Sequence, residues 1–275
     1  MPGFSLARVG AVAAEGVDAG VASHFGNPFA EQRFLTAGGA IVQVPRGIVT
    51  VSGEDRLTWL HSLTSQQLDQ LAPGGSAESL LLGQTGRIEH VLRIIDDGHT
   101  TWLLVEPGET ADLAGWLESM RFMMRVEVAD RSSDFSVFGF FGDSTELSAP
   151  PAAPNGTPIV WRDPWRELVT GGHQYSTVVE HPAAQWSYRE FLIEAGTESS
   201  LADVPLAGTL ALEALRIAAW RPRFATEVDE KAIPHEFDWL RSSVHLSKGC
   251  YRGQETIAKV HNLGHPPRRL VMLHL

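Results

Sequence analysis

The single cysteine of the chain lies in its densest cluster of reactive side chains, residues 248–255, which read Lys-Gly-Cys-Tyr-Arg-Gly-Gln-Glu. Cys250 stands between two cations, Lys248 and Arg252, and cations near a thiol stabilise the thiolate, its reactive form. Gly249 and Gly253 bracket the thiol and allow the backbone to bend tightly or to approach a ligand closely. The alternative is a small buried hydrophobic side chain, the usual state of a free cysteine. The residues by themselves leave both interpretations open.

A basic segment surrounds this cluster. Between His245 and Arg269 the only acidic residue is Glu255. The cations of the segment are Lys248, Arg252, Lys259, Arg268 and Arg269. The whole chain carries a formal charge of −11, so the sign of the charge is reversed locally. Because clustered cations concentrate anions, the sequence predicts an anion-binding site here, with an ordinary solvated surface as the alternative. The overall charge argues against direct binding of nucleic acid, which needs a basic face.

Other chemistries find less support. Cys250, His261 and His265, with His245 upstream, have a spacing that zinc can use, but structural zinc sites usually carry paired cysteines, so no metal is expected. The chain lacks the Gly-x-Ser-x-Gly, Gly-x4-Gly-Lys-Ser/Thr and Gly-x-Gly-x-x-Gly motifs of hydrolases, phosphate-binding loops and dinucleotide-binding folds. Glu89-His90 is a candidate acid–base pair, but neighbouring strand residues point to opposite faces, so a solvent-facing pair is expected.

The composition indicates an ordinary globular protein. The 275 residues are 43% hydrophobic and 20% charged, which allows one large domain or two to three smaller ones. One cysteine cannot form an internal disulfide, as fits a reducing compartment. No apolar run reaches the 18 residues of a membrane span. We therefore expect a cytoplasmic protein without membrane contact, and a monomer.

Patterns along the chain predict a mixture of strands and helices without a βαβ rhythm, so the predicted fold class is α+β. Strands are expected at 48–52, 88–95, 101–105, 126–128, 135–141, 175–179 and 271–275. Helices are expected after a capping box at 52–55, with Leu57, Leu60, Leu63 and Leu68 on one face, and at about 113–120, 183–195 and 207–220.

The expected organisation has five parts. Prolines crowd the middle of the chain, remove backbone donors and indicate a connection between lobes. The parts are a loose N-terminal leader (1–30), one or more first α+β lobes (31–145), a proline-rich connection (146–165), a second α+β lobe (166–245), and the cysteine cluster with the start of a C-terminal β-barrel (246–275).

Residues 248–255 resemble the Lys-Gly-Cys-Tyr/Phe-x-Gly-Gln-Glu signature of the YgfZ family of folate-binding proteins. Further stretches are similar to that family, and the similarity covers roughly residues 31–275. The similar stretches are Val51 to Leu60 at the entry to the first helix, Gly86-Arg87-Ile88 at a turn into a strand, Leu215-Arg216-Ile217, and Ile233-Pro234-His235-Glu236.

The resemblance implies a multi-lobed fold around a central folate channel, like that of the T-protein (aminomethyltransferase) of the glycine cleavage system, with the final β-barrel lobe largely missing. It also implies a protein that binds tetrahydrofolate or another reduced folate and supports iron–sulfur cluster assembly or repair and tRNA modification. Its partners would be iron–sulfur client or assembly proteins. Cys250 would be the reactive thiol, with Lys248 and Arg252 activating it. The folate-binding residues would be Lys248, Tyr251, Gly253, Gln254, Glu255, Arg216 and Glu89.

The alternative function is folate-dependent aminomethyl transfer or a related one-carbon reaction. The T-protein has a functional aspartate just after a Gly-Gly-x-Ile turn, and the matching stretch here, Gly86 to His90, has none. The T-protein also has an acid that contacts folate, and the matching stretch Thr170 to Ser176 lacks it. Both departures argue against a glycine-cleavage enzyme, and whether the chain catalyses any reaction stays open.

Overall fold

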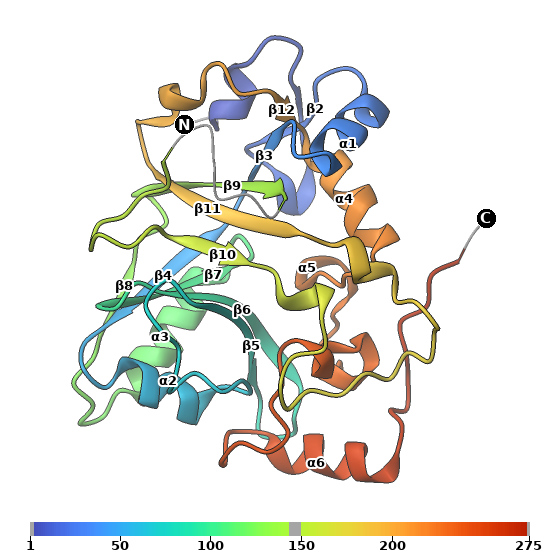
Figure 1. Ribbon diagram of the computed structural model, residues 1–275. Helices are drawn as coiled ribbons and strands as arrows, with labels where there is room; N and C mark the ends of the chain where they lie inside the picture. Colours follow the sequence, from blue (N-terminus) through green and yellow to red (C-terminus); the bar gives the residue numbers. More distant parts are fainter. Residues whose placement is uncertain (1–2, 143–149, 274–275) are drawn as a thin grey trace.

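Two five-stranded sheets stacked face to face form the centre of the protein (Figure 1). The structure is a computed structural model and describes residues 3–142 and 150–273. The first sheet has the order β10 (Val160–Arg162), β11 (Tyr188–Glu194), β9 (Phe135–Phe141), β3 (Ile41–Val44) and β12 (Leu206–Ala207). The second has the order β5 (Ser76–Leu82), β6 (Ile88–Asp96), β7 (Thr100–Val105), β4 (Gly47–Ser52) and β8 (Glu127–Asp130).

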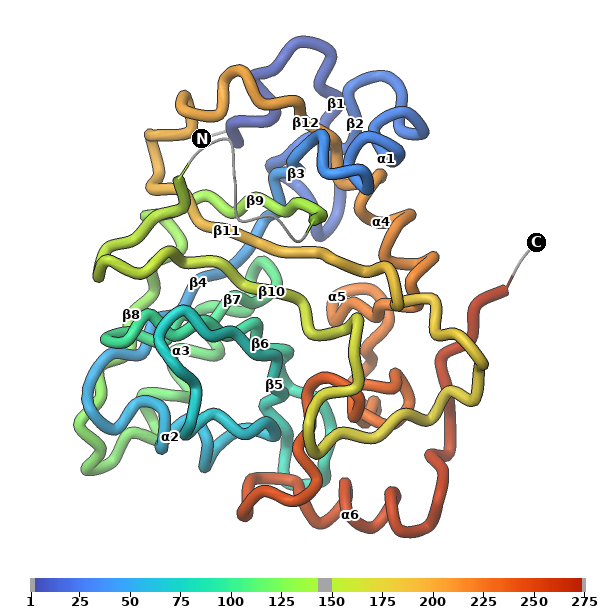
Figure 2. The backbone as a smooth tube through the Cα atoms, viewed as in Figure 1, coloured from blue at the N-terminus to red at the C-terminus, as the bar shows by residue number. Residues whose placement is uncertain are grey.

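Neighbouring strands are antiparallel throughout both sheets, except for the parallel pair β12 and β3. The chain passes from one sheet to the other between β3 and β4, at Pro45-Arg46 (Figure 2). The first sheet takes strands from both of the lobes expected at 31–145 and 166–245.

Alternation along the strands explains why both faces of the second sheet are buried. On β7, Trp102 and Leu104 point into the core between the sheets, whereas Leu103 and Val105 point to the outer face. The period of two residues in a strand produces this division. The outer face is covered by α2 (Arg56–Leu63) and α3 (Thr110–Met120).

The remaining helices are short and lie around the first sheet and at the end of the chain. They are α1 (Pro28–Thr36), which packs on α4 (Thr209–Ala218), then α5 (Phe224–Glu227) and α6 (Gln254–Leu263). Seven 3-10 turns connect elements within the described ranges: η1 (Phe4–Ala7), η2 (Gly16–Asp18), η3 (Pro164–Arg166), η4 (Pro182–Gln185), η5 (Glu198–Leu201), η6 (Pro234–Phe237) and η7 (Trp239–Arg241).

Several predicted elements are confirmed. The strands at 48–52, 88–95, 101–105 and 135–141 correspond to β4, β6, β7 and β9, and the extended stretch at 126–128 overlaps β8. The helices at 113–120 and 207–220 correspond to α3 and α4. The α+β class is correct.

The capping box is wrong. Ser52 is the last residue of β4, and no side chain caps α2. The carboxylate of Asp55 accepts instead from the backbone and side chain of Arg125, at 2.9 Å from its backbone nitrogen. Helix α2 ends at Leu63, so Leu68 lies beyond it, although it is buried in the same core.

The helix at 183–195 is also wrong, because η4 and β11 occupy this stretch. Tyr188 and Leu192 point into the core between the sheets, and Phe191 and Ile193 point to the other face. This is the two-residue period of a strand. Pairing with β9 along the whole strand outweighs the local helical pattern.

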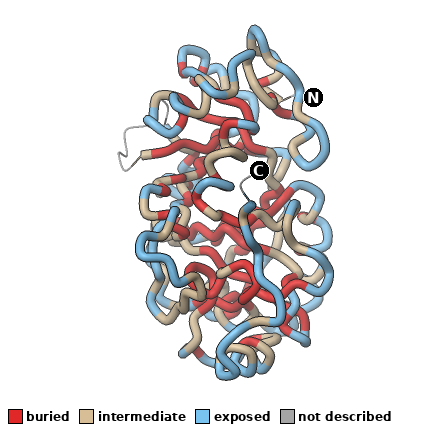
Figure 3. Tube along the Cα trace, turned by 90° about the vertical axis from the view of Figure 1, so that its right-hand side faces the viewer, coloured by how far each residue is buried: buried red, intermediate tan, exposed pale blue. Residues whose placement is uncertain are grey.

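The chain ends differ from the expectation. Residues 3–30 are ordered rather than loose: β1 (Val12–Ala13) pairs with β2 (Ala22–His24), and Ser5 and Val21 are buried. No strand forms at 175–179 or at 271–273, and residues 274–275 lie outside the described residues. Figure 3 shows the segment after α6 as an exposed stretch on the surface.

Candidate functional site

The segment that carries Cys250 is fixed at its first residue, Lys248, to the end of α2 and the residues that follow it. The ammonium group of Lys248 donates to the carbonyl oxygens of His61, Thr64 (2.6 Å) and Gln66 (2.9 Å), at and just beyond the end of α2. A lysine near a helix end commonly binds the last carbonyl groups. Burial lowers the pKa of Lys248 to about 8. Since an ammonium group has three donors, these three contacts use all of them.

Cys250 itself is a free, exposed cysteine. It is therefore not the buried filler that was the alternative interpretation. The ammonium group of Lys248 is turned toward the carbonyl groups of 61–66, and Tyr251 is buried with its ring centre 5.1 Å from the Lys248 nitrogen. The backbone on either side of Cys250 is thus held by buried contacts, while the thiol faces outward.

Arg252 connects the segment to two other elements. Its Nη1 lies 2.7 Å from Oε2 of Glu89 on β6, and its guanidinium lies 5.5 Å from the ring centre of Trp116 on α3. Residues 89 and 252 were both predicted to belong to the site, and the fold brings them into contact. His90 points to the other face and pairs with Glu109 at 2.8 Å. The expected solvent-facing pair is therefore wrong for His90, whose side chain is 12% exposed, whereas that of Glu89 is 38% exposed.

Two glycines form the contact between the segment and the turn before β6. Gly253 has φ +81°, and a Cβ there would lie 2.6 Å from the carbonyl oxygen of Gly83. Gly86, with φ +75°, packs on Thr256. This is the left-handed region that glycine adopts without strain. The role of Gly253 in the structure is to permit a close backbone contact.

The remaining predicted residues of the segment have unequal positions. Gln254 donates to the backbone carbonyl of Lys248 at 3.4 Å, a contact inside the segment. Glu255 is exposed in the first turn of α6, where an acidic side chain is favoured by the helix dipole. These contacts show a compact turn leading into α6.

Three cations of the basic segment are engaged by partners within the protein. Lys248 and Arg252 are engaged as described, and Arg268 pairs with Asp229 (2.8 Å) and Glu236 (2.7 Å). Among the described residues, no group of three or more His, Cys, Asp and Glu side chains is arranged to hold a metal ion. Of the five cations of the segment, Arg252 and Arg268 are thus compensated by acids from elsewhere in the chain, and Lys248 is bound by carbonyl groups.

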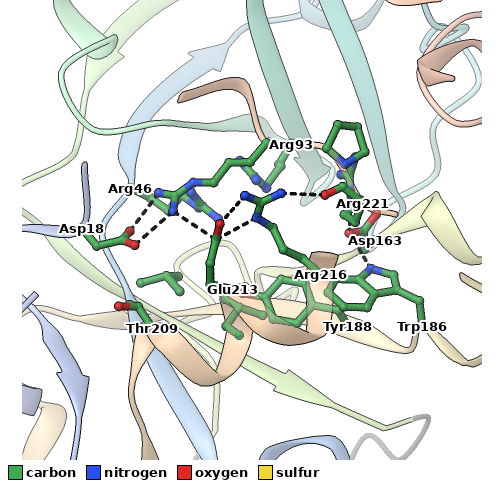
Figure 4. Close-up of a pocket in the computed structure, with 14 residues that line it drawn as sticks. Asp18, Arg46, Arg93, Asp163, Trp186, Tyr188, Thr209, Glu213, Arg216 and Arg221 are labelled. Atoms are coloured by element: carbon green, nitrogen blue, oxygen red, sulfur yellow. Dashed lines mark hydrogen bonds and ion pairs between the residues drawn. The ribbon is translucent and has the colours of Figure 1, made fainter. Parts of the chain in front are cut away.

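Arg216 lies apart from the cysteine segment, in a central cavity between the sheets (Figure 4). It is buried on α4 and pairs with Glu213 and, at 2.9 Å, with Glu227. It also donates to the hydroxyl of Thr226 and to the backbone carbonyl of Arg221, each at 3.1 Å. Its donors are therefore occupied by groups of the protein itself.

A network of buried ion pairs fills most of the space around this cavity. Arg46 joins the two sheets, since it pairs with Glu190 of β11 (2.7 Å) and with Glu106 after β7 (2.9 Å). Burial alone would raise the pKa of Glu106, but Arg46 and the neighbouring arginines hold it at about 2. The other pairs are Arg221 with Glu78 and Asp163, and Arg223 with Asp18 and Glu106.

The cavity does not fit a folate in this arrangement of side chains. It has a volume of about 40 Å³, which is room for roughly three water molecules. A pterin ring alone needs far more space. The guanidinium groups that would suit an anionic tail already have carboxylate partners. A ligand of that size would have to displace part of the network.

The network residues were not identified from the sequence, with the exception of Arg216. A partial signal was available, because Glu78, Arg93 and Glu190 are charged residues within strands that are rich in apolar residues. A charge at such a position requires a buried partner, but the spacing along the chain does not say which partner.

Comparison with known proteins supports the fold and a distant relationship. No family model matches the chain. It is 25% identical over 246 residues to a chloroplastic protein of Arabidopsis thaliana that is named as a transferase, covering 83% of the chain and 54% of that protein. It is 24% identical over 251 residues to the mitochondrial iron–sulfur cluster assembly factor IBA57 homologue of Mycosarcoma maydis, covering 85% of the chain and 56% of that protein. The chain thus spans about half the length of these curated relatives.

Among solved structures, the chain resembles the glycine cleavage system aminomethyltransferase T from Bartonella henselae. The TM-score is 0.69 at 14% identity, over 94% of this chain and 73% of that one. The chain has the aminomethyltransferase T-protein fold. None of the described helices is both long enough and apolar enough to span a bilayer.

Proposed function

We propose that the chain is an accessory factor for the assembly or repair of iron–sulfur clusters, and that it acts through the thiol of Cys250. The observation that carries the proposal is an exposed thiol on a rigid support. Lys248 is fastened to three carbonyl groups on one side, and Gly253 is packed against Gly83 on the other. The relationship to an iron–sulfur cluster assembly factor supports it, as does the YgfZ-like signature.

The chemistry sets a limit on this role. Iron–sulfur clusters are usually held by four thiolates, and the chain has one cysteine. Cys250 would therefore supply one ligand to a cluster that a partner protein also holds. Exposure lets the partner reach the thiol. Lys248, Tyr251, Arg252, Gln254 and Glu89 act as positioning residues in this proposal, because their contacts fix the turn. Support of tRNA modification would follow through client enzymes that contain such clusters.

The test is a complementation experiment with Cys250→Ser in a strain that lacks the gene. The variant should lose most of the support for an iron–sulfur enzyme, whose specific activity is measured in lysate. Gly249→Ala is the matched control in the same segment, since a Cβ there meets nothing within 4 Å. The activity of the client enzyme at equal protein level is the readout. Full complementation by Cys250→Ser would remove the thiol from the mechanism.

Tetrahydrofolate, or another reduced folate, is the cofactor we propose from the YgfZ-like signature and the T-protein fold. Because the central cavity is closed by ion pairs, binding there requires the network to open. Glu213→Gln removes one partner of Arg216 and should therefore strengthen folate binding several-fold in a calorimetric titration. Arg121→Gln, at an exposed pair far from the cavity, should leave the affinity unchanged. Saturable binding by neither the parent nor Glu213→Gln would exclude folate.

Aminomethyl transfer is the second candidate, and the T-protein fold is what favours it. In the stretch Gly86 to His90, which matches the T-protein turn with the functional aspartate, this chain has no aspartate, and the carboxylate of Glu89 is paired with Arg252. Turnover of an aminomethyl-lipoyl donor with tetrahydrofolate would establish this function.

Cytoplasmic location and a monomeric state stay predictions, which fractionation of cells and sedimentation of the purified protein can test.

A further inference from the structure

One buried arginine of the described chain differs from the others. Arg241, at the end of η7, is 2% exposed, and its Nε and Nη1 atoms are buried without a hydrogen-bond partner. Within the described residues its guanidinium forms no ion pair. Its contact is with the ring of Trp165, whose centre lies 4.9 Å away. Arg46, Arg221 and the other buried arginines of the network each have carboxylate partners.

An uncompensated buried charge is unfavourable, because the guanidinium has lost its water and gained no acceptor. The contact of the guanidinium with an aromatic face compensates for part of this free-energy cost. The two acids whose charges interact with Arg241 are Asp163 and Asp238, and both form hydrogen bonds to other groups. Asp163 accepts from Arg221 and Trp186, and Asp238 accepts from the backbone of Tyr175 and Ser176. Burial lowers the pKa of Arg241, consistent with a missing partner.

The surroundings of Arg241 add a second orphan donor and three aromatic rings. His181 lies 5.9 Å from Trp165 and 5.6 Å from Trp220, measured between ring centres. The indole Nε1 of Trp220 is also buried without a partner. Arg221 packs on the same Trp165 ring, at 5.2 Å, so a second positive charge is close. The cluster offers donors and positive charge, and its nearby acceptors are occupied.

Residues 167–181 form no helix or strand, and Figure 1 shows this part of the chain as a long loop. It is fastened to η7 by hydrogen bonds from the backbone of Val169 to the carbonyl of Arg241 (2.9 Å) and of His173 to that of Leu240 (3.0 Å). These bonds place the segment against the backbone of η7, beside Arg241. A segment without regular secondary structure can open at lower cost than a strand or a helix.

We propose that Arg241, with Trp220, forms a binding site for a carboxylate, held among the rings of Trp165, His181 and Trp220 beside segment 167–181. The ligand is either a small free carboxylate or the carboxylate end of a larger molecule. A guanidinium is suited to either, since it binds carboxylates in a planar, two-pronged way. Binding at this site requires neither the Cys250 thiol nor folate. Because the donors of Arg216 are occupied, Arg241 rather than Arg216 is the arginine available to an anion.

The test titrates the full chain with acetate, with p-aminobenzoylglutamate and with inorganic phosphate at constant ionic strength. Binding is followed by tryptophan fluorescence, because Trp165 and Trp220 lie at the site. The parent should bind at least one carboxylate with saturation, and Arg241→Met should bind it at least tenfold more weakly. Arg87→Met, at an exposed position, is the control and should bind like the parent. Preference for p-aminobenzoylglutamate over acetate identifies the end of a larger ligand.

Thermal unfolding without ligand gives an independent readout. If the guanidinium lacks a partner until an anion binds, Arg241→Met removes an uncompensated charge, and this variant should unfold at a higher temperature than the parent. Added carboxylate should raise the unfolding temperature of the parent and leave that of Arg241→Met unchanged. Absence of saturable carboxylate binding in the parent, equal binding by Arg241→Met, or binding of phosphate alone would each overturn the proposal. Lower stability of Arg241→Met together with no binding would show that water satisfies the guanidinium.

Discussion

At the scale of single residues, the two glycines beside Cys250 have different roles, although the sequence presents them as a symmetric pair. Gly253 has φ +81° and touches the backbone of Gly83, whereas a Cβ at Gly249 would meet nothing within 4 Å. One glycine is required by a close contact and by its backbone conformation. The other is not required by packing.

We therefore expect Gly253→Ala to reduce the free energy of unfolding by about 1–3 kcal/mol or more, because it adds left-handed strain to a clash with backbone. Gly249→Ala should stay within about 0.5 kcal/mol of the parent. Chemical denaturation of both variants measures the difference. Equal stability of the two variants would mean that the segment does not pack on the turn at Gly83.

At the scale of elements, segment 167–181 is held by the side chain of Asp238, which lies between η6 and η7. Its carboxylate accepts from the backbone nitrogen atoms of Tyr175 (2.6 Å) and Ser176 (3.3 Å). Asp238 itself has φ +58°, a conformation that Asp and Asn tolerate better than other residues with a side chain. The carboxylate thus accepts the hydrogen bonds that a neighbouring strand would otherwise accept from these two amides.

Asp238→Ala should release this segment, since it removes both acceptors and adds strain at a positive φ. We expect the amide hydrogens of Tyr175 and Ser176 to exchange at least tenfold faster, and stability to fall by about 1–3 kcal/mol. Asp238→Asn keeps one acceptor oxygen and should lie between the parent and the alanine variant. Unchanged exchange at these two amides in Asp238→Ala would contradict the contact.

At the scale of the whole molecule, the buried His235, the half-buried His181 and the buried ion pairs make folding sensitive to acid. Burial lowers the pKa of His235 to about 4, and burial together with Arg241 lowers that of His181 to about 4. An unfolded histidine has a pKa near 6.5. Between these values the unfolded chain binds protons that the folded chain does not, so stability falls as the pH decreases. Glu106, with its pKa near 2, adds a further loss below about pH 4.5.

The midpoint of urea unfolding should therefore decrease steadily from pH 7 to pH 4 and continue to decrease below it. His235→Gln should flatten the dependence between pH 6.5 and 4, whatever its effect on stability at pH 7. His99→Gln, at an exposed position, should keep the slope of the parent. A parent curve that is flat between pH 7 and 4 would contradict the buried, neutral state of His235.

Elements with a strong local pattern could be predicted from the sequence. Thr101 to Val105 and Phe135 to Phe141 are dense in β-branched and aromatic residues, which fit a pleated, buried surface. Residues 183–195 have an ambiguous apolar pattern, and pairing with β9 decided it in favour of a strand. Residues 175–179 look like a strand but lack a partner strand, since Asp238 takes up two of the amides.

The candidate site was predicted in part. The residues of the cysteine segment are consecutive, so a local signature identified them, and the contact of Arg252 with Glu89 joins two residues that the same resemblance had selected. Arg216 was assigned to the same ligand, but it lies in the central cavity with partners of its own. Arg241 was not considered, because nothing in its sequence neighbourhood marks it as unpaired.

The sequence by itself determined the fold class, the principal strands and the segment around Cys250, because these depend on patterns between near neighbours. The tertiary structure decided which charges are compensated. Lys248 meets the carbonyl groups at the end of α2, Arg216 meets two glutamates, and Arg241 is left without an acceptor. The reason is that the partner of a buried charge is set by which distant segments the fold places within about 3 Å of it, and composition and spacing along the chain do not contain that distance.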